Sequence, residues 1–271
     1  MNINDKFKEL RDKNEKALII FITGGYPNYD LSKKIIKTVA ESGADIIEVG
    51  IPFSDPVADG PVIQKASEIA LKNGFSLNKA IQMVKELRCE NVDIPITFMS
   101  YYNVLFNHGL QNLANDLSDV EVNGLIIPDL PPEEADELTI YTKEKNIDMI
   151  YLLAPTMTDD RLDIVSKNSS GFIYFVSVAG VTGTRTVVNN KLPDLIKKVK
   201  EKTDVPVGVG FGVSKKEQVD EINSYADAVI IGSAVINKIT ENLNNEEKLL
   251  EELSIFIKEL KGKNSKIKLI E

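Results

Sequence analysis

Two carboxylates within one short stretch of this chain have the residue types and spacing for acid–base chemistry. Glu48 stands in an apolar run with Ile46, Ile47 and Val49, and Asp59 follows eleven positions later, near the end of a segment rich in Pro, Gly, Ser and Asp. Apolar surroundings raise the pKa of a carboxyl group towards neutrality, where one group can both donate and accept a proton. We expect the two side chains to converge on one cavity, with Glu48 as the principal acid–base group.

Each carboxylate also has a purely structural interpretation. Glu48 would be half of a buried ion pair, but such a pair needs an inward Lys or Arg, and none of the apolar runs given below contains one. Asp59, just before Gly60 and Pro61, would be a turn or helix-capping residue, which is a common use of aspartate. The catalytic interpretation of Asp59 therefore depends on its sharing a loop with Glu48.

The elements that must position these residues recur along the whole chain. Continuous apolar runs without apolar–polar alternation indicate strands buried on both faces, and charged stretches with helical spacing lie between them. Eight such runs are present: Ala17–Thr23, Asp45–Gly50, Ile96–Ser100, Gly124–Pro128, Met149–Ala154, Phe172–Val178, Val205–Gly210 and Ala228–Gly232. The expected helices are Ile3–Lys13, Tyr29–Ser42, two pieces within Gly60–Glu90 broken at Asn73-Gly74, Leu110–Leu117, Glu133–Lys145, Asp159–Lys167, Pro193–Lys202, Lys215–Tyr225 and Glu246–Lys261.

Eight strand–helix units without a linker or a break in composition predict an α/β protein. The predicted fold is a single (β/α)8 TIM barrel with an extra N-terminal helix, and all of residues 1–271 form one domain. An open doubly wound sheet is the competing fold. The strand count and the lack of a dinucleotide-binding fingerprint at any strand–helix turn weigh against it.

Composition narrows the possible functions and the compartment. A formal net charge of −9 disfavours a nucleic-acid-binding surface, which needs clustered Lys and Arg. The single Cys89 excludes an intramolecular disulfide, as suits a reducing cytoplasm. The first residues alternate in charge, and no apolar run approaches the roughly 20 residues of a membrane span. We therefore expect a soluble, cytoplasmic protein.

The C-terminal ends of barrel strands and the loops after them form the working face of such a fold. No lysine lies at these ends, so no amine is available for a Schiff base, and the lone His108 and Cys89 cannot supply a zinc site. Acid–base chemistry by carboxylates remains. The apolar and aromatic cavity walls, suited to a flat ring, are expected from Phe21, Met99, Tyr101, Tyr174 and Phe211.

Three late loops are rich in glycine and follow neighbouring strands, at residues 179–186, 210–214 and 232–234. Glycine lets backbone N–H groups approach an anion closely, and a short helix starting at Ser233 would add its positive end. These glycines predict a phosphate-binding site, although each alone would serve merely to turn the chain. The first of these loops also suits a mobile lid, with Thr182 or Arg185 closing on the substrate. The residues thus favour a lyase or isomerase acting on a phosphorylated substrate with an apolar ring.

The stretch Ile47–Gln64, IEVGIPFSDPVADGPVIQ, resembles the signature of the tryptophan synthase alpha chain family. The resemblance extends over nearly the whole chain through FITGGYP, FMSYYNVLF, GLIIPDLPPEE, YLLAPTMTDDRL, YFVSVAGVTGTR, PVGVGFGVS and AVIIGSAV. It implies a (β/α)8 barrel that cleaves indole-3-glycerol phosphate to indole and glyceraldehyde 3-phosphate in a retro-aldol reaction.

The same resemblance implies roles for particular residues. Glu48 would protonate the indole ring at C3 and take the proton of the glycerol hydroxyl, and Asp59 would hold the indole N–H. Tyr174 and Thr182 look like the family's supports for the substrate and for Asp59. The residues that match its phosphate loops are Gly183, Gly212, Gly232 and Ser233.

A partner is also implied. Members of the family work with a beta chain that carries pyridoxal phosphate, usually as an α2β2 tetramer, and pass indole to it through a tunnel; no cofactor is expected in this chain itself. Ile51-Pro52-Phe53 and Asp55 would be exposed on a partner-facing loop, next to loops at Asn103–Asn107 and Leu130–Pro132. The chain departs from many members in the turn Thr23–Tyr26 and at Pro128. These departures would alter the pocket wall or the partner contact, and neither touches Glu48 or Asp59.

Two other functions stay open on the residues alone. Another phosphate-binding barrel, such as an indole-glycerol-phosphate synthase or a phosphosugar isomerase, is one; a catalytic lysine at a strand end would favour the synthase, and none is seen. An inactive barrel that serves as the allosteric partner of a second subunit is the other, and retention of both Glu48 and Asp59 speaks against it.

Overall fold

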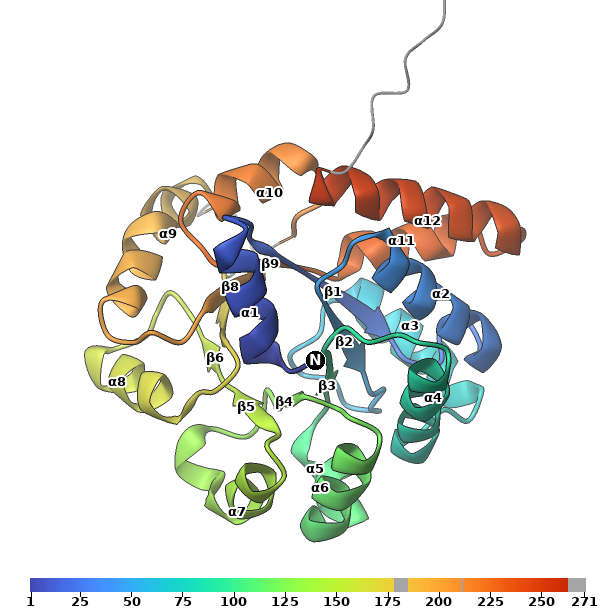
Figure 1. Ribbon diagram of the computed structural model, residues 1–271, viewed down its shortest axis with the longest axis horizontal. Coiled ribbons are helices and arrows are strands. Elements are labelled where there is room, and N and C mark those ends of the chain that lie inside the picture. The colour runs from blue at the N-terminus through green and yellow to red at the C-terminus, as the bar shows by residue number, and fades with distance from the viewer. Residues whose placement is uncertain (178–184, 211, 263–271) are drawn as a thin grey trace, which may run out of the picture.

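A ring of parallel strands surrounded by helices makes up the protein in the computed structural model, which describes residues 1–177, 185–210 and 212–262 (Figure 1). The strands are β1 (Ala17–Thr23), β2 (Ile46–Gly50), β3 (Ile96–Met99), β4 (Gly124–Ile126), β5 (Asp148–Ile150), β6 (Leu152–Leu153), β7 (Ile173–Val176), β8 (Val207–Gly210) and β9 (Ala228–Ile231). Every pairing between neighbouring strands is parallel, in the order β5-β4-β3-β2-β1-β9-β8-β7-β6.

The ring closes through Tyr151, which separates β5 from β6. Strand β5 pairs with β4, while β6 pairs with β7, and the Tyr174 N–H donates to the Tyr151 carbonyl at 3.0 Å. The run predicted as one strand, Met149–Ala154, therefore turns its hydrogen bonding from one neighbour to the other at its middle. Because β5 and β6 together occupy one strand position of the ring, the nine short strands form an eight-stranded barrel. The predicted (β/α)8 barrel is confirmed.

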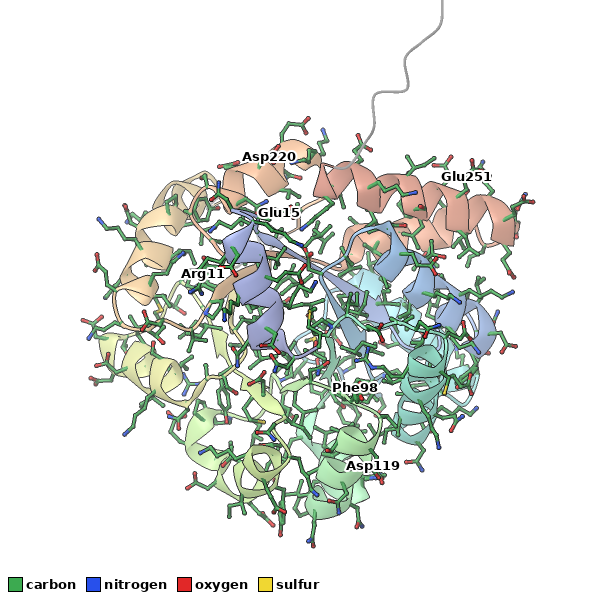
Figure 2. The ribbon with its side chains drawn as sticks, viewed as in Figure 1. Arg11, Glu15, Phe98, Asp119, Asp220 and Glu251 are labelled. Carbon is green, nitrogen blue, oxygen red and sulfur yellow. The ribbon has the colours of Figure 1, made fainter. Side chains whose placement is uncertain are left out.

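Strand alternation separates an inner core from an outer core. On β1, Ile19 and Phe21 face the barrel axis, whereas Leu18, Ile20 and Ile22 pack outwards under the helices. Figure 2 shows Phe98 of β3 between ring and helices, in contrast to Asp119, Asp220 and Glu251, which lie on the outside. Both faces of each strand are thus buried, which explains the unbroken apolar runs of the sequence.

The predicted N-terminal helix closes the N-terminal end of the barrel. Helix α1 (Ile3–Asp12) lies across the centre of the ring in Figure 1. Its buried residues Ile3, Phe7 and Leu10 join the inner core, where the rings of Phe7 and Phe172 are 6.2 Å apart. With this end filled, the open mouth of the barrel lies at the C-terminal ends of the strands.

Most of the predicted helices match helices of the structure closely. The remaining bounds are α2 (Tyr29–Ser42), α3 (Pro61–Lys72), α4 (Leu77–Cys89), α5 (Tyr102–His108), α6 (Leu110–Asp119), η1 (Pro132–Glu134), α7 (Asp136–Glu144), α8 (Asp159–Asn168), α9 (Arg185–Lys200), α10 (Lys216–Asn223), α11 (Ser233–Glu241) and α12 (Glu246–Lys261).

Two predictions of local structure were wrong. Pro193 was taken as the first residue of a helix, a position that proline favours, but α9 starts eight residues earlier and runs through it at the cost of one backbone hydrogen bond. Asn103–Asn107 was taken as a loop, but it belongs to the helix α5, whose Leu105 is fully buried.

The first and last parts of the barrel are joined by helix α12. It packs beside α2, and both are visible together at the edge of the ring in Figure 1. The Lys261 ammonium donates to the Asp45 carboxylate at 2.6 Å and to the Lys16 carbonyl at 3.1 Å, and the side chains of Lys261 and Asp45 are 7% and 10% exposed. Asp45 also accepts from the Leu18 N–H at 2.7 Å, so this ion pair ties α12 to β1.

Within residues 1–177, 185–210 and 212–262, no helix combines the length and the apolar character needed to cross a membrane.

Candidate active site

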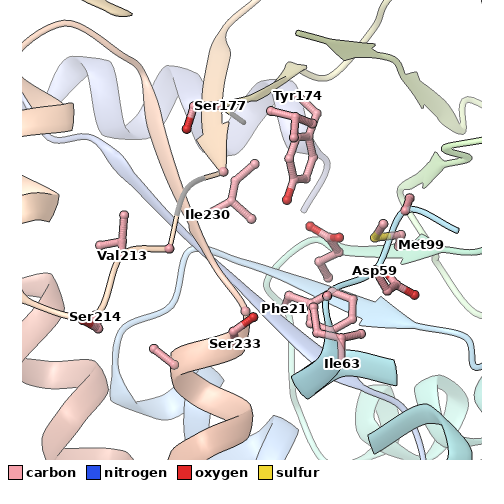
Figure 3. A pocket seen from close by; sticks show the side chains of 18 of the residues that line it. Phe21, Asp59, Ile63, Met99, Tyr174, Ser177, Val213, Ser214, Ile230 and Ser233 are labelled. Carbon is pink, nitrogen blue, oxygen red and sulfur yellow. The ribbon is translucent and has the colours of Figure 1, made fainter. Parts of the chain in front are cut away.

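A cavity of about 490 Å³ opens at the C-terminal ends of the strands (Figure 3). Side chains from the inner face of the ring form its floor, among them Glu48, Met99 and Ile230, and the loops after the strands form its sides. Asp59 and Met99 lie on one side of the cavity in Figure 3, and Val213 and Ser214 lie on the other. The two halves have different chemistry.

Glu48 occupies the middle of β2 and points into the barrel. Its register partners are Phe21 on β1 and Thr97 on β3, and the residue is 0% exposed. Neither carboxylate oxygen has a hydrogen-bond partner among the described residues. Burial, and then the nearby charge of Asp59, raises the pKa of Glu48 to about 8. The ion-pair interpretation therefore finds no support in the described part of the chain.

Asp59 reaches the same cavity from the loop between β2 and α3. The N-cap of α3 is Gly60, and no side chain caps that helix, so Asp59 does not act as the cap. Its N–H donates to the Pro56 carbonyl at 3.1 Å, and its own carbonyl accepts from the Gln64 side chain at 2.9 Å. These bonds fix the backbone and leave the carboxylate to the cavity.

Tyr101 holds the loop that carries Asp59 through a hydrogen bond and a ring contact. Its hydroxyl accepts the Ala58 N–H at 2.9 Å, and its ring stacks on Phe53 with centroids 5.2 Å apart. Burial raises the pKa of Asp59 to about 6, and a hydrogen bond from the Tyr101 hydroxyl partly opposes that rise. Tyr101 was expected to line the pocket. It is instead 3% exposed and absent from the described cavity wall, which makes it a support for Asp59.

Two aromatic walls depend on glycines that face them. The Phe21 ring covers Gly50, where an added Cβ would lie 2.5 Å from the ring, and it also approaches Gly232. The Tyr174 ring covers Gly210 in the same way, at 2.6 Å from an added Cβ. Burial, followed by the charges of Glu48 and Asp59, holds the pKa of Tyr174 well above 10, so its hydroxyl stays protonated as a donor. Glycines at these strand ends let the two rings lie flat against the barrel.

The other half of the cavity is lined by donors without charge. Helix α11 starts at Ser233 after the N-cap Gly232, and no side chain caps it, so its first N–H groups have no intrahelical partner. At Gly212, an added Cβ would meet no other atom within 4 Å, and the Ser214 N–H donates to the Gln218 side chain at 3.0 Å. Of the described lining residues, none is Lys, Arg or His. Such a half-cavity suits an anion bound by backbone groups and hydroxyls.

The predicted residues fall into three groups. Phe21, Glu48, Asp59, Met99 and Tyr174 line the cavity, together with Gly212, Gly232 and Ser233. Tyr101 lies behind the wall. Thr182, Gly183 and Phe211 lie outside the described residues.

Several lining residues were missed, although their spacing could have revealed them. Val176 lies two residues after Tyr174, and Ile230 two before Gly232, so strand alternation turns each to the cavity face. Asn237 is four residues after Ser233, on the same side of α11. Ile63 and Leu152 are further apolar lining residues that the sequence did not single out.

The exposed loop predicted at Ile51-Pro52-Phe53 differs from the observed one. Ile51 and Pro52 are buried and Phe53 is half-buried, because the Ile51 N–H continues the strand pairing to the Met99 carbonyl at 2.8 Å. The large apolar residue that this loop exposes is Val57, at 86%, and Asp55 is exposed two residues before it. On α5, Phe106 is 52% exposed.

Within the described parts of the chain, no cluster of three or more His, Cys, Asp and Glu side chains is arranged to hold a metal ion.

Fold and cavity define the class of protein: a (β/α)8-barrel enzyme whose site lies at the C-terminal ends of the strands. The family model described as tryptophan synthase alpha chain matches residues 7–265. The chain is 44% identical over 252 residues to the tryptophan synthase alpha chain of Methanocaldococcus jannaschii, covering 93% of this chain and 89% of that one.

Solved structures agree with these sequence matches. Tryptophan synthase subunit alpha from Legionella pneumophila superposes with a TM-score of 0.89 at 31% identity, over 97% of this chain and 98% of that one. A chain of tryptophan synthase from M. tuberculosis, in an aminoacrylate-bound form, has a TM-score of 0.86 at 35% identity, over 96% and 98%. The chain belongs to the tryptophan synthase alpha chain family, a family of lyases.

Proposed function

We propose that this chain cleaves indole-3-glycerol phosphate to indole and glyceraldehyde 3-phosphate by acid–base catalysis. The observation that carries the proposal is the buried Glu48 carboxyl, which meets Asp59 in one cavity and has no partner among the described residues. Membership of the tryptophan synthase alpha chain family supports the same reaction.

Glu48 is proposed to move both protons of the reaction. As an acid it protonates C3 of the indole ring, and the ring then carries the positive charge of an indolenine cation. As a base it next accepts the proton of the glycerol hydroxyl on the carbon attached to C3. The C–C bond breaks, its electron pair returns to the ring, and the hydroxyl carbon becomes the aldehyde. A pKa raised to about 8 by burial suits a group that must both give and take a proton.

Asp59 is proposed to hold the indole N–H and to stabilise the positive charge on the ring during this step. It lies on the Met99 side of the cavity, where the walls are apolar and aromatic. A carboxylate close to developing positive charge favours the transition state more strongly in such surroundings than in water. Phe21, Met99 and Tyr174 are the proposed wall of the indole site.

The phosphate group is proposed to bind in the opposite half, at Gly212, Gly232 and Ser233, with Gly183 as a further contact from outside the described residues. Thr182 and Phe211 are likewise proposed substrate contacts. A distance fixed by the barrel wall between the phosphate and the ring would place the scissile bond beside Glu48. Binding energy from the phosphate would thus orient the reacting carbon.

A beta chain is the proposed partner, in an α2β2 tetramer that receives indole from this cavity. The exposed Asp55 and Val57 of the loop after β2 and the half-exposed Phe106 on α5 give charged and apolar surface for this contact. In the expected loop Leu130–Pro132, Leu130 and Pro132 are buried, which leaves Pro131 as its partly exposed residue. The chain itself is proposed to use no cofactor, pyridoxal phosphate being confined to the partner. We further propose a cytoplasmic location and one domain over residues 1–271.

The decisive experiment supplies indole-3-glycerol phosphate to the purified chain, alone and with a beta chain, and measures glyceraldehyde 3-phosphate. Release of glyceraldehyde 3-phosphate, stimulated by the beta chain, is expected. If none is released in either condition, the proposed reaction is wrong. A barrel that merely regulates its partner would instead change the rate of the beta chain without releasing this product.

A further inference from the structure

Ser177 is a cavity residue to which neither the sequence nor the reaction above gives a role. It is the first residue after β7 and is only 4% exposed, and its N–H donates to the Gly210 carbonyl at 3.2 Å. Its hydroxyl oxygen is buried and has no hydrogen-bond partner among the described residues. Leaving a buried hydroxyl unpaired costs about 1 to 3 kcal/mol, so a structural explanation is needed.

The cavity supplies that explanation. Some other buried side-chain atoms without partners lie away from it, as in Ser166 and Ser169 of the α8 region. Among the described residues that line the cavity, those with such atoms are Glu48 and Ser177. The substrate is proposed to exchange protons with Glu48, and a second group of the substrate can in the same way supply the hydrogen-bond partner of the Ser177 hydroxyl.

The position of Ser177 indicates which part of a ligand it meets. Figure 3 shows it on the side of Val213, away from Asp59 and Met99. It borders the half-cavity whose described lining has no cationic side chain. A phosphate bound there has only neutral donors to satisfy its oxygens, and hydrogen bonds to a charged acceptor are about twice as strong as those between neutral groups.

We propose that the Ser177 hydroxyl donates a hydrogen bond to the phosphoryl group of the substrate. This inference rests on the proposed function, because it requires a phosphorylated ligand in the cavity. It makes Ser177 a binding residue that contributes to affinity and to selection of phosphorylated over unphosphorylated substrates. Ser177 takes no part in proton transfer.

The unpaired hydroxyl separates this proposal from a structural role. If Ser177 served the fold, Ser177→Ala would destabilise the free protein. Because the hydroxyl has no partner among the described residues, the free Ser177→Ala protein should instead melt at the same temperature as the wild type or higher. Its affinity for phosphorylated ligands should fall about tenfold, as expected for the loss of one bond to a charged group.

The test measures binding of glycerol 3-phosphate and of inorganic phosphate to the full-length wild type, Ser177→Ala and Ser169→Ala, by calorimetry. Ser169→Ala is the matched control, since it also removes a buried hydroxyl without a partner but lies outside the cavity lining. The expected result is weaker binding of both probes by Ser177→Ala alone, with indole affinity unchanged.

Other outcomes would overturn the proposal. Equal affinities in wild type and Ser177→Ala exclude the contact, and loss for glycerol 3-phosphate but not for inorganic phosphate assigns the hydroxyl to the glycerol part instead. A lower melting temperature of free Ser177→Ala restores a structural role. If the wild type itself binds neither probe, the proposed function fails, and that result is distinct from a failure of the Ser177 contact alone.

Discussion

Glu48 holds its carboxyl group in the barrel interior without a cation beside it in the described residues, and this isolation gives it its chemistry. Glu48→Gln keeps the shape of the side chain but can neither give nor take a proton. We expect indole release to fall by about 10²- to 10⁴-fold, while glycerol 3-phosphate binds as before. Single-turnover assays and calorimetry measure the two quantities.

The matched control is Glu144→Gln, at the exposed end of α7, which should retain full activity. Near-normal turnover by Glu48→Gln would remove Glu48 from the mechanism.

The pH dependence of activity follows from the same two carboxyl groups. Glu48 must first be protonated, so the rate should fall as the pH rises through about 8. Asp59 must be charged, so the rate should also fall as the pH drops through about 6. We expect a bell-shaped profile of kcat/KM between these values, since kcat/KM reports the free enzyme. A profile that stays flat from pH 5 to 9 would contradict both assignments.

The raised pKa of Glu48 should also make the stability of the folded protein depend on pH. The unfolded chain releases its proton near the ordinary pKa of 4.5, whereas the folded protein keeps it up to about 8. The folded state therefore binds more protons between these values, and the stabilisation is complete below pH 4.5 and lost as the pH rises through about 8.

Glu48→Gln has no such loss. We therefore compare the melting temperature of Glu48→Gln minus that of the wild type at two pH values. We expect this difference to be larger at pH 9 than at pH 4 by about 3 °C or more. Calorimetric scans of both proteins at the two pH values give the comparison, and parallel curves would show that the Glu48 pKa is not raised.

At the scale of elements, the loop between β2 and α3 depends on Tyr101 of the neighbouring strand end. Tyr101→Phe removes the hydroxyl that accepts from Ala58 and bonds to Asp59. Because that bond lowers the pKa of Asp59, its loss should move the acid limb of the pH profile upwards from about 6 and reduce kcat about tenfold. Tyr102→Phe is the control, and an unmoved acid limb in Tyr101→Phe would refute the supporting role.

Strand β8 has no room for a side chain at Gly210, because the Tyr174 ring covers that position. An alanine at Gly210 would place its Cβ 2.6 Å from that ring and push it into the cavity. We expect Gly210→Ala to raise KM by at least about tenfold while the fold persists. The control is Gly208→Ala on the same strand, where the nearest atoms are 3.3 Å from an added Cβ, and its KM should rise less. Equal KM values in the two variants would argue against the steric explanation.

The sequence predicted the helices and strands well where one local signal dominated. Asn73-Gly74 divided α3 from α4, and alternation of apolar runs with charged stretches gave the barrel. It failed where tertiary packing decided. Pro193 lies inside a helix, and Ile51 is buried because it pairs with β3 beyond the regular strand.

The site shows the same division. Glu48 and Asp59 could be predicted to share a cavity, because a carboxylate in an apolar run is unusual. The place of Tyr101 behind the wall could not, since only the folded loop brings Ala58 to its hydroxyl. The position of Ser177 at the end of a strand placed it at the cavity, but a serine there is common and suggested no role. Only the packed structure shows that its hydroxyl has no partner among the described residues.

At the scale of the whole molecule, α1 carries part of the stability of the barrel. Phe7 is 5% exposed and packs on Phe172 in the inner core. We expect Phe7→Ala to lower the free energy of unfolding by about 3 to 5 kcal/mol, as for other buried phenylalanines, with little change in kcat at low temperature. Denaturant titration measures this, and Phe106→Ala, half-exposed, is the control. A loss below 1 kcal/mol would show that α1 is dispensable for the fold.

The joining of α12 to β1 through Lys261 and Asp45 has a consequence for synthesis of the protein. Strand β1 also pairs with β9, so two of its contacts wait for residues made some 200 positions later. On the ribosome, an emerging chain exposes β1 as an unpaired edge until β9 has left the exit tunnel, and α12 can dock only after that. Closing so long a loop is slow. We therefore expect the nascent barrel to remain an open sheet until β9 emerges, and Lys261 to reach Asp45 only after that.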